Sequence, residues 1–84
     1  MRLDDLDLPC AVVVSWVDHF DLGAGTWVRL ADVGDEVPMP VISCAWLIRC
    51  TDDVLTLCQS VTEGGDGRGV FVVVRAAVQN WRAL

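Results

Sequence analysis

The sequence lacks most of the residues and spacings that mark a catalytic or metal site. It has no lysine and no tyrosine, and its only histidine is His19. Its four cysteines include no Cys-x-x-Cys pair, the spacing typical of redox motifs and zinc ribbons. The glycine-rich stretch at 63–69 lacks the Gly-Lys-Ser/Thr ending of a phosphate-binding loop. We therefore expect a non-enzymatic protein with no catalytic residue, no bound metal and no cofactor.

His19 is the one residue that could still form part of a metal site or a catalytic site. It lies between Asp18 and Asp21, and such a cluster can orient an imidazole or hold a weakly bound metal ion. A nucleophilic cysteine would also have to use His19 as its base. We favour a solvated turn over both.

Long apolar runs are missing as well. None approaches the roughly 20 residues that a membrane-spanning helix needs, and Met1-Arg2 leads into acidic residues instead of a secretory signal. We expect a cytoplasmic protein with no membrane partner. Its cysteines (Cys10, Cys44, Cys50 and Cys58) should then be free thiols.

The charge of the chain is acidic and unevenly distributed. The net charge is −6, and residues 1–36 hold eight acids against Arg2 and Arg29, which accounts for all of it. An acidic chain repels phosphate backbones, so general nucleic-acid binding is disfavoured. A charged rim that keeps an apolar domain in solution explains the same pattern.

A β-hairpin at 41–61 organises the rest of the chain. Two runs rich in Val, Ile, Leu and Trp flank Asp52-Asp53, which is the pattern of two strands and a turn. With the turn at these aspartates, one face receives Trp46, Ile48, Cys50, Leu55 and Leu57. We predict that this face is buried.

The remaining segments predict a single β domain at 10–84 behind an acidic arm at 1–9. The arm is either frayed or a single turn. Residues 10–20 predict a first strand that is either central or covered on both faces. Residues 25–33 predict a short strand or a single helical turn, and residues 34–40 a loop. Residues 70–74 are apolar on both faces and predict a buried strand, followed by a tight bend at 75–77 and a closing strand at 78–84.

From Trp46 onward this layout resembles the second half of an Sm-like barrel. The fold expected is all-β: a small five-stranded Sm-like β-barrel or a strongly bent antiparallel sheet, with at most one short helical turn. An open sheet or sandwich is the alternative. The RNA site of Sm-like proteins is not recognisable here, so RNA binding is only a distant alternative function.

A second resemblance spans more of the chain. It rests on V-S-W-V-D at 14–18, W-V-R-L at 27–30, S-C-A-W-L-I-R-C-T-D-D at 43–53, L-T-L at 55–57 and R-A-A-V at 75–78. Together these are similar to a family of short uncharacterised proteins encoded by phages and prophages. Ala45 and Val74 depart from the glycine and proline that its members tend to have there. The resemblance implies an accessory protein in the host cytoplasm and no known catalytic residues.

The four tryptophans are the best functional hint. A barrel this small has room for one or two indole rings, so others should lie on a surface, where tryptophan marks interfaces or stacks on planar ligands. The candidate residues for binding a ligand or partner are Trp27, Trp81, Arg68, Arg75 and Arg82. We expect an interaction module that binds a host protein or a small ligand. The alternative is a sequestering protein for a nucleotide signal, which would use stacking and arginine contacts to phosphate.

We also expect a homo-oligomer. The late strands carry only Arg75 and Arg82 as charged guards and no proline, and unguarded sheet edges invite partners. The chain is 54% hydrophobic, which is more apolar side chain than so small an interior can hold. Trp81 is the tryptophan we place between subunits. A monomer whose tail covers its own edge is the alternative.

Overall fold

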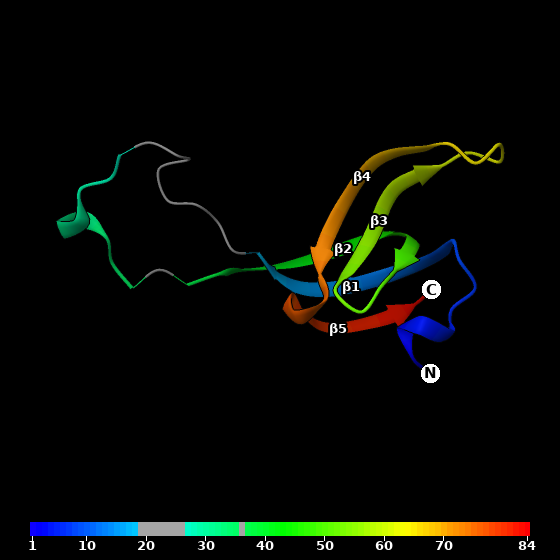
Figure 1. Ribbon diagram of the computed structural model, residues 1–84, viewed down its shortest axis with the longest axis horizontal. Coiled ribbons are helices and arrows are strands. Elements are labelled where there is room, and N and C mark those ends of the chain that lie inside the picture. Colours follow the sequence, from blue (N-terminus) through cyan, green and yellow to red (C-terminus); the bar gives the residue numbers. More distant parts are fainter. Residues whose placement is uncertain (19–26, 36) are drawn as a thin grey trace.

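The computed structural model describes residues 1–18, 27–35 and 37–84, and its five strands form one antiparallel sheet (Figure 1). The strands are β1 (Cys10–Asp18), β2 (Met39–Cys50), β3 (Val54–Val61), β4 (Gly67–Val74) and β5 (Val78–Ala83), in the order β4-β3-β2-β1-β5. Short 3-10 turns lie at η1 (Leu3–Asp5), η3 (Leu30–Asp32) and η4 (Arg75–Ala77). The predicted all-β class and central first strand are confirmed.

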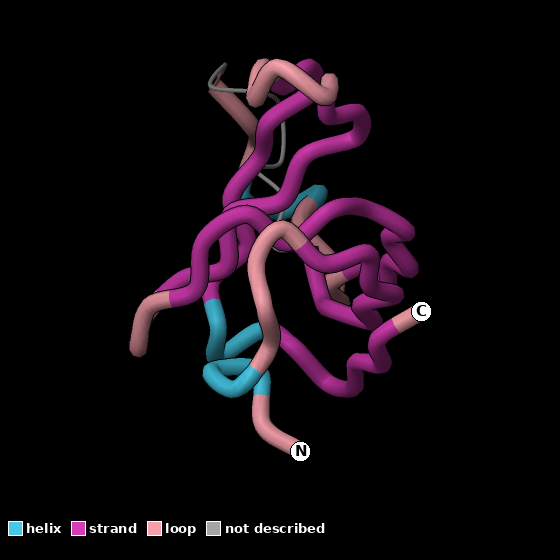
Figure 2. The backbone as a smooth tube through the Cα atoms, turned by 90° about the vertical axis from the view of Figure 1, so that its right-hand side faces the viewer, coloured by secondary structure: helices cyan, strands magenta, loops and turns pink. Residues whose placement is uncertain are grey.

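The sheet is strongly bent. In a flat five-stranded sheet the two edge strands would lie about 19 Å apart, four spacings of about 4.8 Å. Here β4 and β5 are those edges, and only the three residues of η4 separate them in the chain. The sheet must therefore curl until its edges approach at one end, and Figure 2 shows this curl along the long axis.

The curled sheet stays open. Among the described residues β4 pairs with β3 alone and β5 with β1 alone. A closed barrel is thus not what the structure shows, whereas the bent antiparallel sheet, the other form predicted, is. The openness matters for function because both edge strands keep one side without a strand partner.

The core lies on the concave face of the sheet. Its members are apolar and alternate along their strands, as expected where one face is buried: Val12 and Val14 of β1, Ala45 and Leu47 of β2, Leu55 and Leu57 of β3, and Val73 of β4, with Leu3 of η1 closing one end. The side chains of Trp16 and Trp81 pack against this cluster while remaining partly exposed. The arm at 1–9 is therefore the single turn of the two forms predicted, and Leu3 anchors it.

The central hairpin has the predicted turn but not the predicted buried face. Cys50 pairs with Leu55 and Arg49 with Thr56, as expected, but the next pair is Leu47 with Leu57. Ile48 is thus a β-bulge, which adds one residue to β2 and turns every side chain beyond it to the opposite face.

The bulge overturns two assignments on the hairpin face. Ala45 and Leu47 are buried in place of Trp46 and Ile48, and Trp46 lies on the outer face with 39% of its surface exposed. The predicted face was therefore correct for Leu55 and Leu57 and wrong for Trp46 and Ile48, while Cys50 is partly buried against the core.

The loop predicted at 34–40 ends earlier than expected, because β2 already begins at Met39. Pro40 lies in β2 opposite Val17. It is tolerated because β2 has no β3 partner at this point, so the missing N–H breaks no bond on that side. Within the described part of residues 25–33, the helical turn is present as η3 and no strand is.

Gly69 gives a test of the β3–β4 pairing. Its φ is +71°, and a Cβ there would lie 2.6 Å from Gln59 Oε1. We predict that Gly69→Ala lowers the free energy of unfolding by about 1–2 kcal/mol, because a side chain strains this left-handed backbone. Gly64→Ala is the matched control, since its nearest neighbour would be Thr62 Oγ1 at 3.8 Å. Urea denaturation of both variants checks this, and equal losses would contradict it.

Candidate interaction surface

The β4 strand presents an unguarded edge. It pairs through its whole length with β3, and its other side has no strand partner among the described residues. Its sequence, GRGVFVVV, contains no proline and no acid, and its one charge is Arg68. Exposed edges without such guards are templates for further pairing.

The outer face of β4 is apolar and open to solvent. Val70, Val72 and Val74 are 56%, 58% and 58% exposed, so the prediction of a strand buried on both faces is wrong. The strand lies at the edge of the sheet, and only its inward residues Phe71 and Val73 meet the core. Isolated exposed valines are ordinary, but three in a row on an edge form a patch.

Neighbouring strands extend this patch. Val70 pairs with Cys58, which pairs with Trp46, and Val72 pairs with Thr56, which pairs with Arg49. Directly paired side chains share a face. We call the resulting surface the β4 face; it consists of Trp46, Arg49, Arg68, Val70, Val72 and Val74. It combines apolar side chains with two arginines and contains no acid.

A groove runs along this edge. It has a volume of about 190 Å³ and lies between the end of β1 and the end of β4. Its lining is mostly apolar: Trp16, Val17 and Asp18 from β1, Val72, Val73 and Val74 from β4, and Ala77 from η4. The Trp16 indole is already held there, since its Nε1 donates to Ser43 Oγ at 3.0 Å. The groove is thus the open seam of the sheet.

Arg75, a predicted ligand contact, is engaged within the chain. Its Nη1 and Nη2 donate to the two carboxylate oxygens of Asp4 at 3.1 and 3.3 Å, and Nη1 also donates to the Thr51 carbonyl at 2.8 Å. These bonds tie η1, the β2–β3 turn and η4 together, and Figure 2 shows the two helical turns side by side. Arg75 therefore has a structural role, which the sequence did not indicate because Asp4 is 71 residues away.

This cluster also sets two protonation states. The bonds from Arg75 lower the pKa of Asp4, and a bond from the Cys50 thiol at 3.3 Å lowers it further. Burial raises the pKa of Cys50, as does its bond to the Asp4 carboxylate. A thiol held protonated in this way is a poor nucleophile.

The Asp4–Arg75 pair predicts a pH dependence. Because the pKa of Asp4 is lower in the folded than in the unfolded chain, its stabilising effect is complete above its ordinary pKa of about 3.9 and is lost as the pH falls below it. Asp4→Asn should therefore be less stable than the wild type at pH 7, and the gap should close as the pH falls below about 4. Urea denaturation across this range measures it.

Asp7→Asn is the control, because it removes an exposed carboxylate that has no ion pair with another described residue. A gap between Asp4→Asn and the wild type that stayed constant with pH would contradict the assigned role of the pair.

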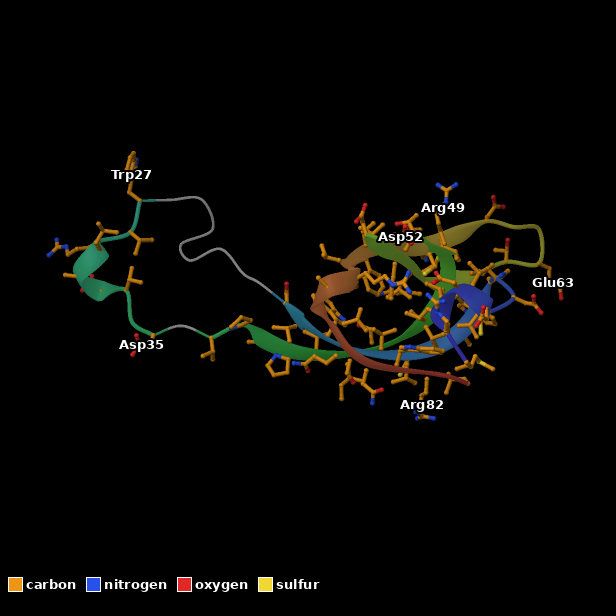
Figure 3. The ribbon with its side chains drawn as sticks, turned by 60° about the horizontal axis from the view of Figure 1, so that its bottom comes forward. Trp27, Asp35, Arg49, Asp52, Glu63 and Arg82 are labelled. Carbon is orange, nitrogen blue, oxygen red and sulfur yellow. The ribbon has the colours of Figure 1, made fainter. Side chains whose placement is uncertain are left out.

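The other predicted site residues lie on separate elements. Trp27 is fully exposed and stands far from the sheet, next to η3 (Figure 3). Trp81 on β5 points to the core, and Arg82 points outward on the same strand. Arg68 is at the start of β4. Trp27 and Trp81 thus converge with none of these arginines.

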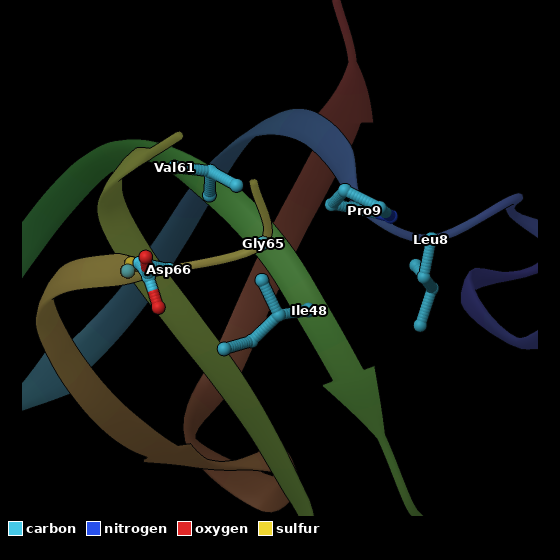
Figure 4. A pocket seen from close by; sticks show the side chains of 8 residues that line it. Leu8, Pro9, Ile48, Val61, Gly65 and Asp66 are labelled. Atoms are coloured by element: carbon cyan, nitrogen blue, oxygen red, sulfur yellow. The ribbon is translucent and has the colours of Figure 1, made fainter. Parts of the chain in front are cut away.

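Two further cavities bear on ligand binding. One of about 260 Å³ is lined mainly by apolar residues and Asp66 (Figure 4): Leu8, Pro9, Ile48, Cys58, Val61, Gly65, Asp66 and Gly67. The other, of about 420 Å³, adjoins Arg68 and contains hydroxyl groups, again beside Asp66. The Asp66 carboxylate lines both cavities and would repel a phosphate group there. Neither cavity is lined by a tryptophan.

The remaining site predictions concern metals and thiols. His19 lies outside the described residues. Within the described ranges, no three of the metal-binding residue types His, Cys, Asp and Glu gather around one point. All four cysteines are free thiols.

Comparisons of the chain with protein family models, with curated proteins and with solved structures found no match. Over the described ranges, every helix is too short or too polar to cross a membrane.

Proposed function

We propose that this chain is a non-enzymatic interaction module that self-associates through the β4 edge and the β4 face. The observation that carries the proposal is the β4 face itself: an edge strand with Val70, Val72 and Val74 each more than half exposed. Burying such a surface is favourable by roughly 25 cal/mol for each Å² of apolar area.

The assembled protein, in this proposal, binds a host protein or a small ligand for a phage or other mobile element. The seam groove beside Trp16 would provide the binding surface, since it is apolar and borders the edge where copies meet. The proposed setting is the host cytoplasm, and the support for a phage origin is the sequence resemblance alone.

Sequestration of a nucleotide signal has less support. It needs an aromatic ring and an arginine at one place. The seam groove has Trp16 but also Asp18 and no arginine, and the cavity at Arg68 has no tryptophan. In the described part of one chain these groups are separate, so a nucleotide site built from them would have to form between subunits.

Sedimentation equilibrium of the wild-type protein tests the proposal. At micromolar concentration we expect species heavier than the 9.2 kDa chain, with a distribution that shifts with concentration. A single 9.2 kDa species across the range would refute self-association. Native mass spectrometry of protein purified from cells would then show whether a small molecule accompanies the assembly.

A further inference from the structure

The ends of β1 and β2 extend beyond the sheet. Their ladder continues as far as Asp18 opposite Met39. The pairing of β1 with β5 already stops at Trp16, and that of β2 with β3 stops at Trp46. Beyond both Trp16 in β1 and Trp46 in β2, only the pairing of β1 with β2 continues. These two strand ends lead to a segment that stands away from the sheet (Figures 1 and 3). We call the described residues 27–35 and 37–40 the projection.

The projection is more apolar than a free segment should be. Five of its large apolar side chains are exposed: Trp27, Leu30, Val33, Val37 and Met39. Trp27 is fully exposed and Leu30 is 86% exposed, so the sheet of the same chain does not cover them. A two-stranded ribbon is at best marginally stable in water. A partner surface that covers these side chains would remove their apolar area from water and would also stabilise the two-stranded ribbon.

The charges indicate which surface that is. The projection carries Asp32 and Asp35 against Arg29 next to its apolar residues, and with Glu36 the sequence 27–40 has three acids against one arginine, a net charge of −2. The β4 face carries Arg49 and Arg68 and no acid of its own, and Asp66 lines the cavity that adjoins Arg68 at its border. Neither arginine has an ion pair with another described residue. An acidic apolar segment and a basic apolar face are complementary.

We infer that the projection of one copy docks on the β4 face of a second copy. Trp27 and Leu30 pack on Val70 and Val72, and the projection's acids face the arginines at the two sides of the patch. Trp27 alone offers roughly 150–250 Å², whereas one side of a stable interface buries about 800 Å². The other apolar side chains of the projection are needed to reach that area. The inference rests on the proposed self-association and specifies its geometry.

The first experiment removes the apolar contact. Trp27→Asp/Leu30→Asp should weaken self-association at least about 30-fold in sedimentation equilibrium, because two charges would enter the interface. The fold should persist, since both residues are exposed, and circular dichroism checks this. Leu84→Asp is the control: Leu84 is also exposed but follows β5, the edge strand opposite β4 in the sheet, and belongs to neither surface. It should leave association unchanged.

The second experiment tests the charge pairing. Arg49→Glu/Arg68→Glu should weaken association about 10-fold or more, because acids would then face Asp32 and Asp35. Adding Asp32→Arg/Asp35→Arg to that variant should restore most of the affinity. The rescue also returns the net charge from −10 to −6, so Asp5→Arg/Asp7→Arg, which makes the same change at exposed positions outside the projection, is its control and should restore less. A failure of Asp32→Arg/Asp35→Arg to restore more affinity than this control would overturn the docking geometry.

The third experiment locates the contact directly. A photoreactive residue, p-benzoylphenylalanine, replaces Trp27 in unlabelled protein that is mixed with ¹⁵N-labelled wild type. Crosslinks from the unlabelled chain to labelled residues 68–74 or to Trp46 are expected. Crosslinks confined to the same chain, or to the partner's projection, would overturn the inference.

The outcomes separate the two proposals. A monomeric wild type refutes self-association and the docking together. An oligomeric wild type whose assembly survives Trp27→Asp/Leu30→Asp refutes the docking alone and leaves the β4 edge as the interface.

Discussion

Replacement of Leu47 by alanine is expected to lower the free energy of unfolding by about 2–5 kcal/mol. The side chain is 0% exposed and lies opposite Leu57 at the centre of the core. Truncation removes buried apolar area and leaves a cavity that a thin core fills poorly. A domain of this size has only about 5–10 kcal/mol of stability, so the variant should unfold at far lower urea concentration.

Leu84→Ala is the matched control, because it makes the same change at a leucine that is 70% exposed. It should change stability by no more than about 0.5 kcal/mol. Similar losses for the two variants would mean that Leu47 does not point into the core, and thus that β2 lacks the bulge at Ile48.

That bulge marks the limit of the sequence-based prediction. The period-2 pattern and the Asp52-Asp53 turn identified the hairpin and its first two residue pairs correctly. Both Leu47 and Ile48 are apolar, so the pattern supports either as the inward residue. Packing against strands that are distant in the sequence decides which of the two residues points inward. A local sequence pattern contains no information on that packing. One extra residue then reversed the face of Trp46.

The candidate surface was predictable only in part. The absence of acids and prolines from the late strands indicated unguarded edges, and β4 and β5 are the edges of the sheet. The exposure of Val70, Val72 and Val74 was missed, because a run that is apolar on both faces reads as a buried strand. The role of Arg75 was missed because its partner Asp4 lies at the other end of the chain.

Lysines on the β4 face should abolish most self-association. Val70→Lys/Val72→Lys places two charges where two half-exposed valines now lie, next to the existing cations Arg49 and Arg68. Burying an unpaired charge costs several kcal/mol, and about 3 kcal/mol is more than a 100-fold change in Kd. We therefore expect the dissociation constant from sedimentation equilibrium to rise at least about 100-fold, with the fold retained because both side chains point away from the core.

Net charge offers a second explanation, and a charge-matched control separates the two. The double lysine variant changes the net charge from −6 to −4. Asp7→Asn/Glu63→Gln makes the same change at exposed positions outside the β4 face. A smaller net charge weakens repulsion between copies, so this control should associate as well as the wild type or slightly better. If both variants dissociated alike, or if the lysine variant stayed assembled, the β4 face would not be the surface where copies meet. Loss of assembly in the lysine variant alone would place the interface on that face, because charge repulsion acts on the two variants equally and burial does not.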